Sequence, residues 1–453
     1  MIDYKVTQIS SRKSPLKNRF LLPIIFLVVF SVYIFSPKIT PYDSRWSIHT
    51  SLSILHEGNA DLDEYKEAII DNKYYAIETI DGHYYTVFPI GVSLLALPFV
   101  AIAEIIFEPL MESFPALEIL FKERLAEYGV QVDDLRFIQI YPAVELVTAS
   151  FFCALATVFI FLIAQLRLST LYSLMSVFIF AFCTSSWSTS SRALWQHGPS
   201  MLMLSIAIYL LLIDKERNIL IHYVAIPLAM AFIIRRTNSV PILFISIYIL
   251  IFRRKHFLKY LLVSLPFIVF FFYYNFSVYG TFSSNYFQNE SGRFLMSNSF
   301  LEAIVGNIVS PSRGLFIFSP ILALSLFGFL RLLFYRKINS LEIFFALIII
   351  SHWLLISCFF PWWAGHSYGP RTFSDMVPFF MYFLCLFFEP VISLPALKKM
   401  AAFAIITPLV VFSFYVNYKG AFSRAVYEWN VTPTNISVDP DRLWDWHDAQ
   451  FLR

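Results

Sequence analysis

The chain has 453 residues, of which 58% are apolar, 19% are aromatic and 14% are charged, and its formal net charge is +3. This composition is too apolar for an ordinary soluble domain, and the basic residues form no patch that would suit nucleic acid. Repeated apolar runs of about 17–25 residues are long enough to cross a bilayer core of roughly 30 Å. We therefore predict an all-α polytopic membrane protein surrounded by membrane lipid.

The N-terminal residues 1–19 are basic and precede an apolar run at 20–36. Because basic residues favour the cytoplasmic side of a membrane, we expect a cytoplasmic N-terminus followed by a first transmembrane helix. A cleaved signal peptide is the alternative, but no small-x-small cleavage site follows the run.

The interval after this first span is unusually acidic, since residues 37–134 hold 17 of the 31 Asp and Glu residues but only 6 Lys and Arg. One apolar stretch, Val87–Phe107, lies inside it. Proline and glycine make this stretch unsuited to an uninterrupted span, and we expect a re-entrant or interfacial hairpin. The residues concerned are Pro89, Gly91, Pro98 and Pro109.

Ten further apolar runs follow along the chain. They are Phe137–Leu166, Leu171–Trp187, Leu194–Ile213, Ile219–Ile234, Val240–Phe252, Phe257–Tyr279, Leu315–Tyr335, Ile343–Phe360, Phe373–Phe388 and Met400–Tyr418. If Val87–Phe107 does not cross, every strongly basic loop falls on the cytoplasmic side with the N-terminus. We therefore predict about 11 transmembrane helices.

This topology divides the chain into five parts. Residues 1–19 are the cytoplasmic end, 20–36 the first span, 37–135 a large external loop, 136–418 the helical bundle, and 419–453 an external tail. Interfacial helices such as Ala116–Tyr128 are expected in the external loop. Such a protein fits a bacterial inner (plasma) membrane.

Several arginines depart from the charge rule by falling at external turns. A cation at the membrane boundary is costly unless it has a partner, and a guanidinium matches phosphate well. We interpret these arginines as binding sites for a shared anionic ligand such as a lipid phosphate, with pairing to the acids of the external loop as the alternative. They are Arg192, Arg235, Arg236, Arg313 and Arg371.

Aromatic and polar side chains accompany these arginines. Flat apolar faces beside hydrogen-bonding groups suit a sugar, whereas Trp and Tyr at an interface also serve as membrane anchors. The candidate substrate-binding residues are His197, Trp362, Trp363, His366 and Tyr368.

Asp43 follows the first span by a few residues, with Tyr42 and Arg45 beside it as further substrate-binding candidates. A carboxylate held close to the membrane surface is suited to act as a general base toward an acceptor hydroxyl. The alternative is a charge that flanks the span or pairs with Arg45.

Three other sites involve polar residues that need an explanation. The acidic group Asp61-Leu62-Asp63-Glu64 is interpreted as a solvated face, with a divalent metal as the alternative. Glu145 lies inside a predicted span and should require a partner, and His352 is interpreted as structural.

The layout resembles the GT-C glycosyltransferases, multispan enzymes that include protein O-mannosyltransferases and the aminoarabinose transferase of lipid A. The nearest motif matches are Tyr42-Asp43, Phe88-Pro89-Ile90-Gly91 and Arg235-Arg236-Thr237. The resemblance implies a polyprenyl-phosphate sugar donor, transfer with inversion at the external face, and a glycan, lipid or protein acceptor.

The same resemblance implies that Asp43 is the catalytic base and that Arg235, Arg236 and Arg371 hold the leaving phosphate. The chain has a single Asp where the family has an Asp-Asp or Asp-Glu pair, so no metal ligand is assigned, although a divalent cation remains an alternative cofactor. Two other functions stay open, a lipid-linked glycan ligase or polymerase and a lipid-linked glycan transporter or flippase. A transporter would be expected to have paired internal repeats, which the sequence does not show.

Overall fold

The computed structural model describes residues 19–37, 44, 46–70, 76–113, 141–217, 220–282 and 299–453. Within these residues the chain is mostly helical, and its only strands form one short antiparallel pair. The predicted all-α class is therefore confirmed.

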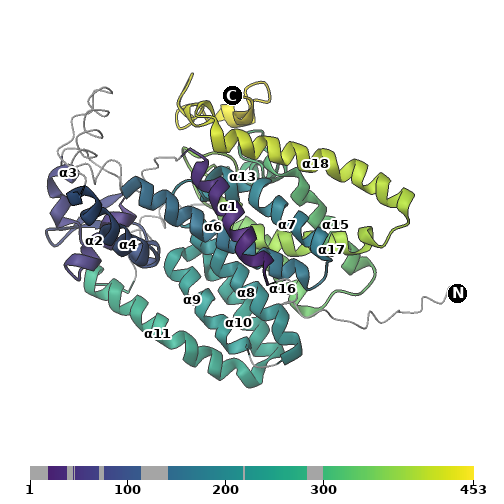
Figure 1. The fold of residues 1–453 in the computed structure, drawn as a ribbon, viewed down its shortest axis with the longest axis horizontal. Coiled ribbons are helices and arrows are strands. Elements are labelled where there is room, and N and C mark those ends of the chain that lie inside the picture. Colours follow the sequence, from purple (N-terminus) through teal and green to yellow (C-terminus); the bar gives the residue numbers. More distant parts are fainter. Residues whose placement is uncertain are drawn as a thin grey trace.

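Helix α6 lies in the interior of the molecule (Figure 1). Its packing partners are α1, α7 and α8, and the bounds of the four helices are Tyr141–Gln165, Leu21–Phe35, Thr170–Phe182 and His197–Arg217. Helix α6 is mostly apolar around its circumference, as expected for a buried helix, and small residues such as Ala149 and Ala156 are fully buried on it. Small side chains allow close helix packing, which brings the start of α8 against α6.

The chain then forms a group of helices that lies below α6 in Figure 1. Its elements are η4 (Ile221–Val224), α9 (Ala225–Ile234), η5 (Arg236–Asn238), α10 (Ser239–Phe252) and α11 (Arg254–Tyr279). Helix α11 carries many exposed apolar side chains along its length, including Leu258 and Tyr273. An apolar surface of this extent on a 26-residue helix suits contact with lipid hydrocarbon.

The last third of the chain builds the other side of the bundle. Its elements are α13 (Phe300–Val309), α14 (Leu315–Phe318), η6 (Pro320–Ala323), α15 (Leu324–Phe334), α16 (Ser340–Ser357), η7 (Arg371–Met376), α17 (Val377–Ile392) and α18 (Ala396–Phe422). Helix α16 begins with a capping box, because Asn339 and Glu342 each bond the other's backbone N–H. Helix α17 packs against α15, and its buried side chains join the main apolar core.

Six helices among the described residues are long and apolar enough to cross a membrane. They are Tyr141–Gln165, His197–Asp214, Arg254–Tyr279, Ser340–Ser357, Arg371–Ile392 and Ala396–Phe422. Each corresponds to a predicted span. The other five predicted spans coincide with shorter apolar helices, so the number eleven stays a prediction.

Two predicted segments have a different shape in the structure. The run Leu315–Tyr335 is broken into α14, η6 and α15, because Pro320 has no N–H to continue the first helix. The run Val87–Phe107 does not form a hairpin, since α4 is one continuous helix from Gly91 to Ser113. Pro89 lies before its first turn, and Pro98 is tolerated within an otherwise intact helix.

The acidic interval contains a small folded unit beside α4. Its elements are α2 (Ser47–His56), η1 (Asp63–Tyr65), α3 (Lys66–Ile70), β1 (Ile77–Ile80) and β2 (His83–Thr86). The strands are joined by Asp81-Gly82, both with positive φ, as a tight two-residue hairpin requires. The expected helix Ala116–Tyr128 lies outside the described residues.

The C-terminal tail packs onto the turns that connect α13, α14 and α16 to their neighbours. It contains α19 (Ala425–Glu428), η8 (Pro440–Trp444) and η9 (Gln450–Leu452). Trp429 and Leu443 are buried with Trp362 and Trp363 in one apolar cluster. The tail is therefore an integral part of this end of the molecule.

Candidate functional site

A buried polar cluster joins three segments that are far apart in the sequence. His197 is the first residue of α8, Arg235 follows α9, and Asp375 lies in η7. Arg235 donates a hydrogen bond to Asp375 Oδ2, and its Nη1 lies 2.8 Å from His197 Nδ1. The Asp375 side chain is completely buried, so the ion pair with Arg235 offsets the cost of placing its charge there.

Close backbone packing positions this cluster. At Gly198, an added Cβ would lie 3.0 Å from Cys153 Sγ of α6, so the first turn of α8 sits directly against that helix. At Gly91, a Cβ would lie 2.6 Å from the backbone of Ile233 and Ile234, which immediately precede Arg235. Only glycine leaves room for the approach at Gly91, whereas a side chain at Gly198 would require Cys153 to shift.

The hydrogen bonds assign the protons of both histidines. Because a guanidinium only donates, His197 Nδ1 is the acceptor, and the neutral ring carries its proton on Nε2. His352 of α16 lies 3.0 Å through Nε2 from the carbonyl oxygen of Thr372, so Nε2 donates and Nδ1 carries a lone pair. Both rings lie within electrostatic range of Arg235.

The cluster contains acceptor atoms with spare hydrogen-bonding capacity. His352 Nδ1 and Asp375 Oδ1 are buried and make no hydrogen bond, and Oδ1 lies 3.5 Å from His197 Nδ1. Buried acceptors without donors are uncommon and costly. A ligand hydroxyl could donate to either atom.

Arg371 adds a second guanidinium to this region. It lies over the indole ring of Trp195, 4.7 Å from the ring centroid, and it donates a 2.9 Å hydrogen bond to the carbonyl of Ala364. The buried indole Nε1 of Trp195 makes no hydrogen bond. Arg235 and Arg371 both lie within electrostatic range of His197, and guanidinium groups bind anions well.

Arg313 has a different environment from that of a ligand-binding group. All five of its N–H donors bond protein acceptors: the carbonyls of Ser312, Trp363 and Gly365 and the side chains of Asn430 and Gln450. Burial, together with the charge of Arg371, lowers the pKa of Arg313 to about 9. Arg313 therefore positions the turn at 363–365 and the tail.

The guanidinium of Arg192 is also bound by groups of the protein itself. Its guanidinium donates to the carbonyls of Pro37 (2.6 Å) and Gly420 and lies over the ring of Tyr427. Burial lowers the pKa of Arg192. These contacts tie the end of α1 to α18 and the tail.

The aromatic residues predicted to bind a sugar are mostly buried. Trp362 donates to Glu302, Trp363 packs beside it, and the Tyr368 hydroxyl donates to the carbonyl of Val416. Only His366 is exposed, where its Nε2 lies 3.0 Å from Asn435 Oδ1. The three buried rings pack against the tail and do not form a surface.

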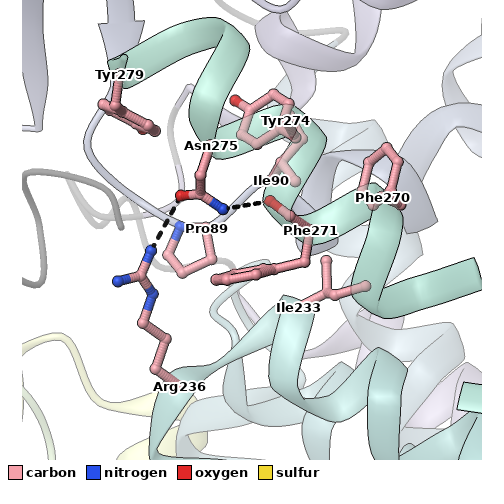
Figure 2. A pocket seen from close by; sticks show the side chains of 9 residues that line it. All are labelled: Pro89, Ile90, Ile233, Arg236, Phe270, Phe271, Tyr274, Asn275 and Tyr279. Carbon is pink, nitrogen blue, oxygen red and sulfur yellow. Dashed lines mark hydrogen bonds between the residues drawn. The ribbon is translucent and has the colours of Figure 1, made fainter. Parts of the chain in front are cut away.

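Arg236 lies in a pocket that faces the exposed helix α11 (Figure 2). It donates a 3.5 Å hydrogen bond to Asn275 and lies over the ring of Phe271. The nine lining residues are Pro89, Ile90, Ile233, Arg236, Phe270, Phe271, Tyr274, Asn275 and Tyr279. The lining is apolar and aromatic apart from the guanidinium of Arg236 and the amide of Asn275.

Tyr42, Asp43 and Arg45 lie outside the described residues. Their neighbour Ser44 donates to the carboxylate of Glu145, and the same carboxylate oxygen accepts a 3.1 Å hydrogen bond from the backbone of Leu194. Glu145 thus has the partners that its position in a span required.

The sequence interpretation missed Asp375 and assigned His352 only a structural role. Asp375 could have been found by the reasoning applied to Glu145 and His352, since it is a titratable residue inside a predicted apolar span. Their pairing was not predictable because the partners come from other helices.

The fold and this cluster define a helical protein whose long apolar helices suit a membrane and surround buried cationic and acidic groups. Comparison of the chain with protein-family models, curated proteins and solved structures finds no match.

Proposed function

We propose that the protein is a membrane glycosyltransferase that moves a sugar from a polyprenyl-phosphate donor to an acceptor hydroxyl, with inversion. The observation that carries the proposal is the pocket of Arg236, in which a single guanidinium lies at an apolar and aromatic wall beside exposed helix α11. A lipid phosphate has the same two parts, a long apolar chain and an anionic head.

The cationic groups have a clear chemical task in this reaction. The base removes the acceptor proton, the acceptor oxygen attacks the anomeric carbon, and the bond to the phosphate oxygen breaks. Negative charge then grows on the leaving phosphate, where Arg235, Arg236 and Arg371 would stabilise it. Arg235 and Arg236 are adjacent in the chain and link the buried cluster to the pocket.

Asp43 remains the proposed base. The hydrogen bonds of Glu145 to Ser44 and to the backbone of Leu194 support this assignment, because they connect the residue after Asp43 to the segment that carries Trp195 and His197. The loop charges support an external site and a cytoplasmic N-terminus in a bacterial inner membrane.

Donor binding is tested with the purified full chain in lipid nanodiscs and a polyprenyl phosphate, read by native mass spectrometry. Arg236→Gln should weaken binding by about tenfold or more, since a charge-assisted hydrogen bond is worth roughly 1.5–3 kcal/mol. Arg254→Gln is the matched control, because Arg254 is exposed at the opposite end of α11. Equal binding by both variants would remove the pocket from the donor site.

Transfer is tested with Asp43→Asn in the same preparation. Loss of glycan product with retained donor binding would support Asp43 as the base, and full activity would contradict this assignment. The mass of the product separates the related functions: one added sugar supports a transferase, and addition of a whole oligosaccharide supports a ligase or polymerase. Movement of lipid-linked glycan across vesicles without any product would indicate a transporter.

A further inference from the structure

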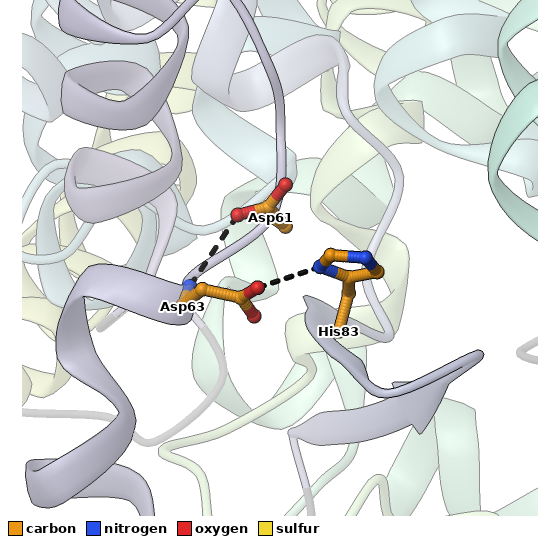
Figure 3. A group of neighbouring side chains, drawn as sticks. All are labelled: Asp61, Asp63 and His83. Atoms are coloured by element: carbon orange, nitrogen blue, oxygen red, sulfur yellow. Dashed lines mark hydrogen bonds and ion pairs between the residues drawn. The ribbon is translucent and has the colours of Figure 1, made fainter.

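Three metal-ligating side chains meet in the small folded unit of the acidic interval (Figure 3). Asp61 lies in the loop before η1, Asp63 is the first residue of η1, and His83 is the first residue of β2. Each offers one ligand atom, and these atoms lie within 4.8 Å of one another. His83 Nδ1 is 2.6 Å from Asp63 Oδ2.

Local backbone pairing explains why the two aspartates face the hairpin. The N–H of Leu62 donates to the carbonyl of Tyr84 (2.8 Å), and the N–H of Tyr84 donates to Asp63 Oδ1 (3.0 Å). Leu62 is fully buried in the apolar cluster that also holds Trp46 and Ile69. The hydrogen bonds of Leu62 and Tyr84 therefore hold residues 61–63 against the second strand of the hairpin.

The low exposure of Asp61 is a further feature of this group. Asp61 is 7% exposed, yet its carboxylate accepts only a long 3.4 Å hydrogen bond from the N–H of Asp63. No ion pair joins Asp61 to a Lys or Arg within the described ranges. A carboxylate with so little exposure and one weak hydrogen bond gains from a nearby cation, whereas the 39% exposed side chain of Asp63 agrees with the solvated-face interpretation.

The donor set selects among cations. Calcium and magnesium prefer oxygen ligands throughout, whereas zinc accepts imidazole nitrogen together with carboxylate oxygen. Ligand atoms around tetrahedral zinc are roughly 3.3 Å apart, so His83 Nδ1 and Asp63 Oδ2 must separate slightly as the metal replaces the proton between them. The His83 and Asp63 side chains are 55% and 39% exposed, which leaves an open path for the ion.

We propose that Asp61, Asp63 and His83 bind one zinc ion that fastens the 61–63 loop to the β1–β2 hairpin. Three protein ligands leave one coordination position for water. The hairpin also lies near the pocket of Arg236, since Glu78 and Tyr85 are within electrostatic range of Tyr279. The zinc site does not depend on the proposed transferase activity.

The test uses the full chain purified in detergent, stripped with EDTA, desalted and titrated with zinc chloride. Elemental analysis should find about one zinc per chain. His83→Ala and the nearly isosteric Asp61→Asn should each weaken binding by about tenfold or more. His447→Ala is the matched control, because His447 is exposed and its Nδ1 lies 3.6 Å from Asp445 without belonging to a three-residue group in the described chain.

Thermal unfolding provides a second measurement that does not depend on activity. Zinc should raise the unfolding temperature of the wild type and of His447→Ala, and it should not raise that of His83→Ala. Because His83 is exposed, its replacement should leave the metal-free unfolding temperature unchanged. Absence of zinc binding in the wild type, or equal binding by His83→Ala, would overturn the proposal, as would tighter binding of calcium than of zinc.

Discussion

Arg313 and Arg235 are both arginines held inside the same protein, but their surroundings serve different purposes. Arg313 bonds five protein acceptors, so every donor of its guanidinium is used to hold the 363–365 turn and the tail. Arg235 pairs with Asp375 in a cluster where Asp375 Oδ1 and His352 Nδ1 make no hydrogen bond. A satisfied network indicates a structural role, and spare acceptors indicate room for a ligand.

The largest expected effect is the loss of Arg313. Arg313→Ala leaves five acceptors without their donor, at about 1–3 kcal/mol for each one that remains buried, which exceeds the stability of many domains. We expect little folded protein in fluorescence-detected gel filtration. Arg424→Ala is the control, because Arg424 is 91% exposed and pairs only with Glu428. A normal yield of Arg313→Ala would show that the network is not structural.

Breaking the pair of Arg235 and Asp375 should have the next largest effect. Arg235→Gln leaves the fully buried Asp375 carboxylate without its ion-pair partner and should cost about 3–5 kcal/mol, and Asp375→Asn, which removes the carboxylate from Arg235, should also be destabilising. The double variant should recover about 1–3 kcal/mol of the summed loss, measured by thermal unfolding of all four proteins. Additive losses would mean that the two side chains do not interact.

A smaller effect is expected at Gly91, which sets the distance between α4 and the segment before Arg235. Gly91→Ala places a Cβ 2.6 Å from the backbone of Ile233, and relief of this overlap should cost about 1–3 kcal/mol. Donor binding should fall as well, because Ile90 and Ile233 line the pocket of Arg236. Gly58→Ala is the control, because no atom lies within 4 Å of the corresponding Cβ. Its positive φ makes this substitution locally strained, but it creates no overlap with a neighbouring element. Unchanged binding by Gly91→Ala would separate the pocket from donor recognition.

The smallest change in stability should come from His352→Gln. The Gln amide can still donate to the carbonyl of Thr372, and the Nδ1 acceptor that is lost has no hydrogen bond to break. Unfolding should shift by less than about 1 kcal/mol, whereas transfer activity should fall if a ligand hydroxyl uses Nδ1. A large loss of stability with unchanged activity would show that the role of His352 is purely structural.

The helices were the most predictable part of the molecule. Each of the six helices able to cross a membrane coincides with a predicted apolar run, because hydrophobicity and length are local properties. The predicted shape was wrong in two apolar runs, because a proline interrupts the helix in one run and not in the other. Pro320 ends α14, whereas Pro98 lies inside continuous α4, and packing against neighbouring helices decides which outcome occurs.

The sequence identified which residues need a partner, but it did not identify the partners. An arginine near a membrane boundary must find an anion or acceptor, which singled out Arg192, Arg235, Arg313 and Arg371 from the sequence. The contacts then separated them, since Arg313 meets residues 117 and 137 positions away and Arg235 meets a residue 140 positions away. The partner of Asp61 was equally unpredictable, because only the folding of the β1–β2 hairpin brings His83 close to it.

The sequence by itself determined that this is a helical protein with long apolar segments, an acidic interval after the first of them, and arginines that need partners. The tertiary structure decided which arginines are satisfied by protein groups, that Asp375 and His352 join the Arg235 cluster, and that Asp61, Asp63 and His83 converge. The physical reason is that apolar burial depends on composition along one helix, whereas pairing of charges depends on the positions of several helices at once.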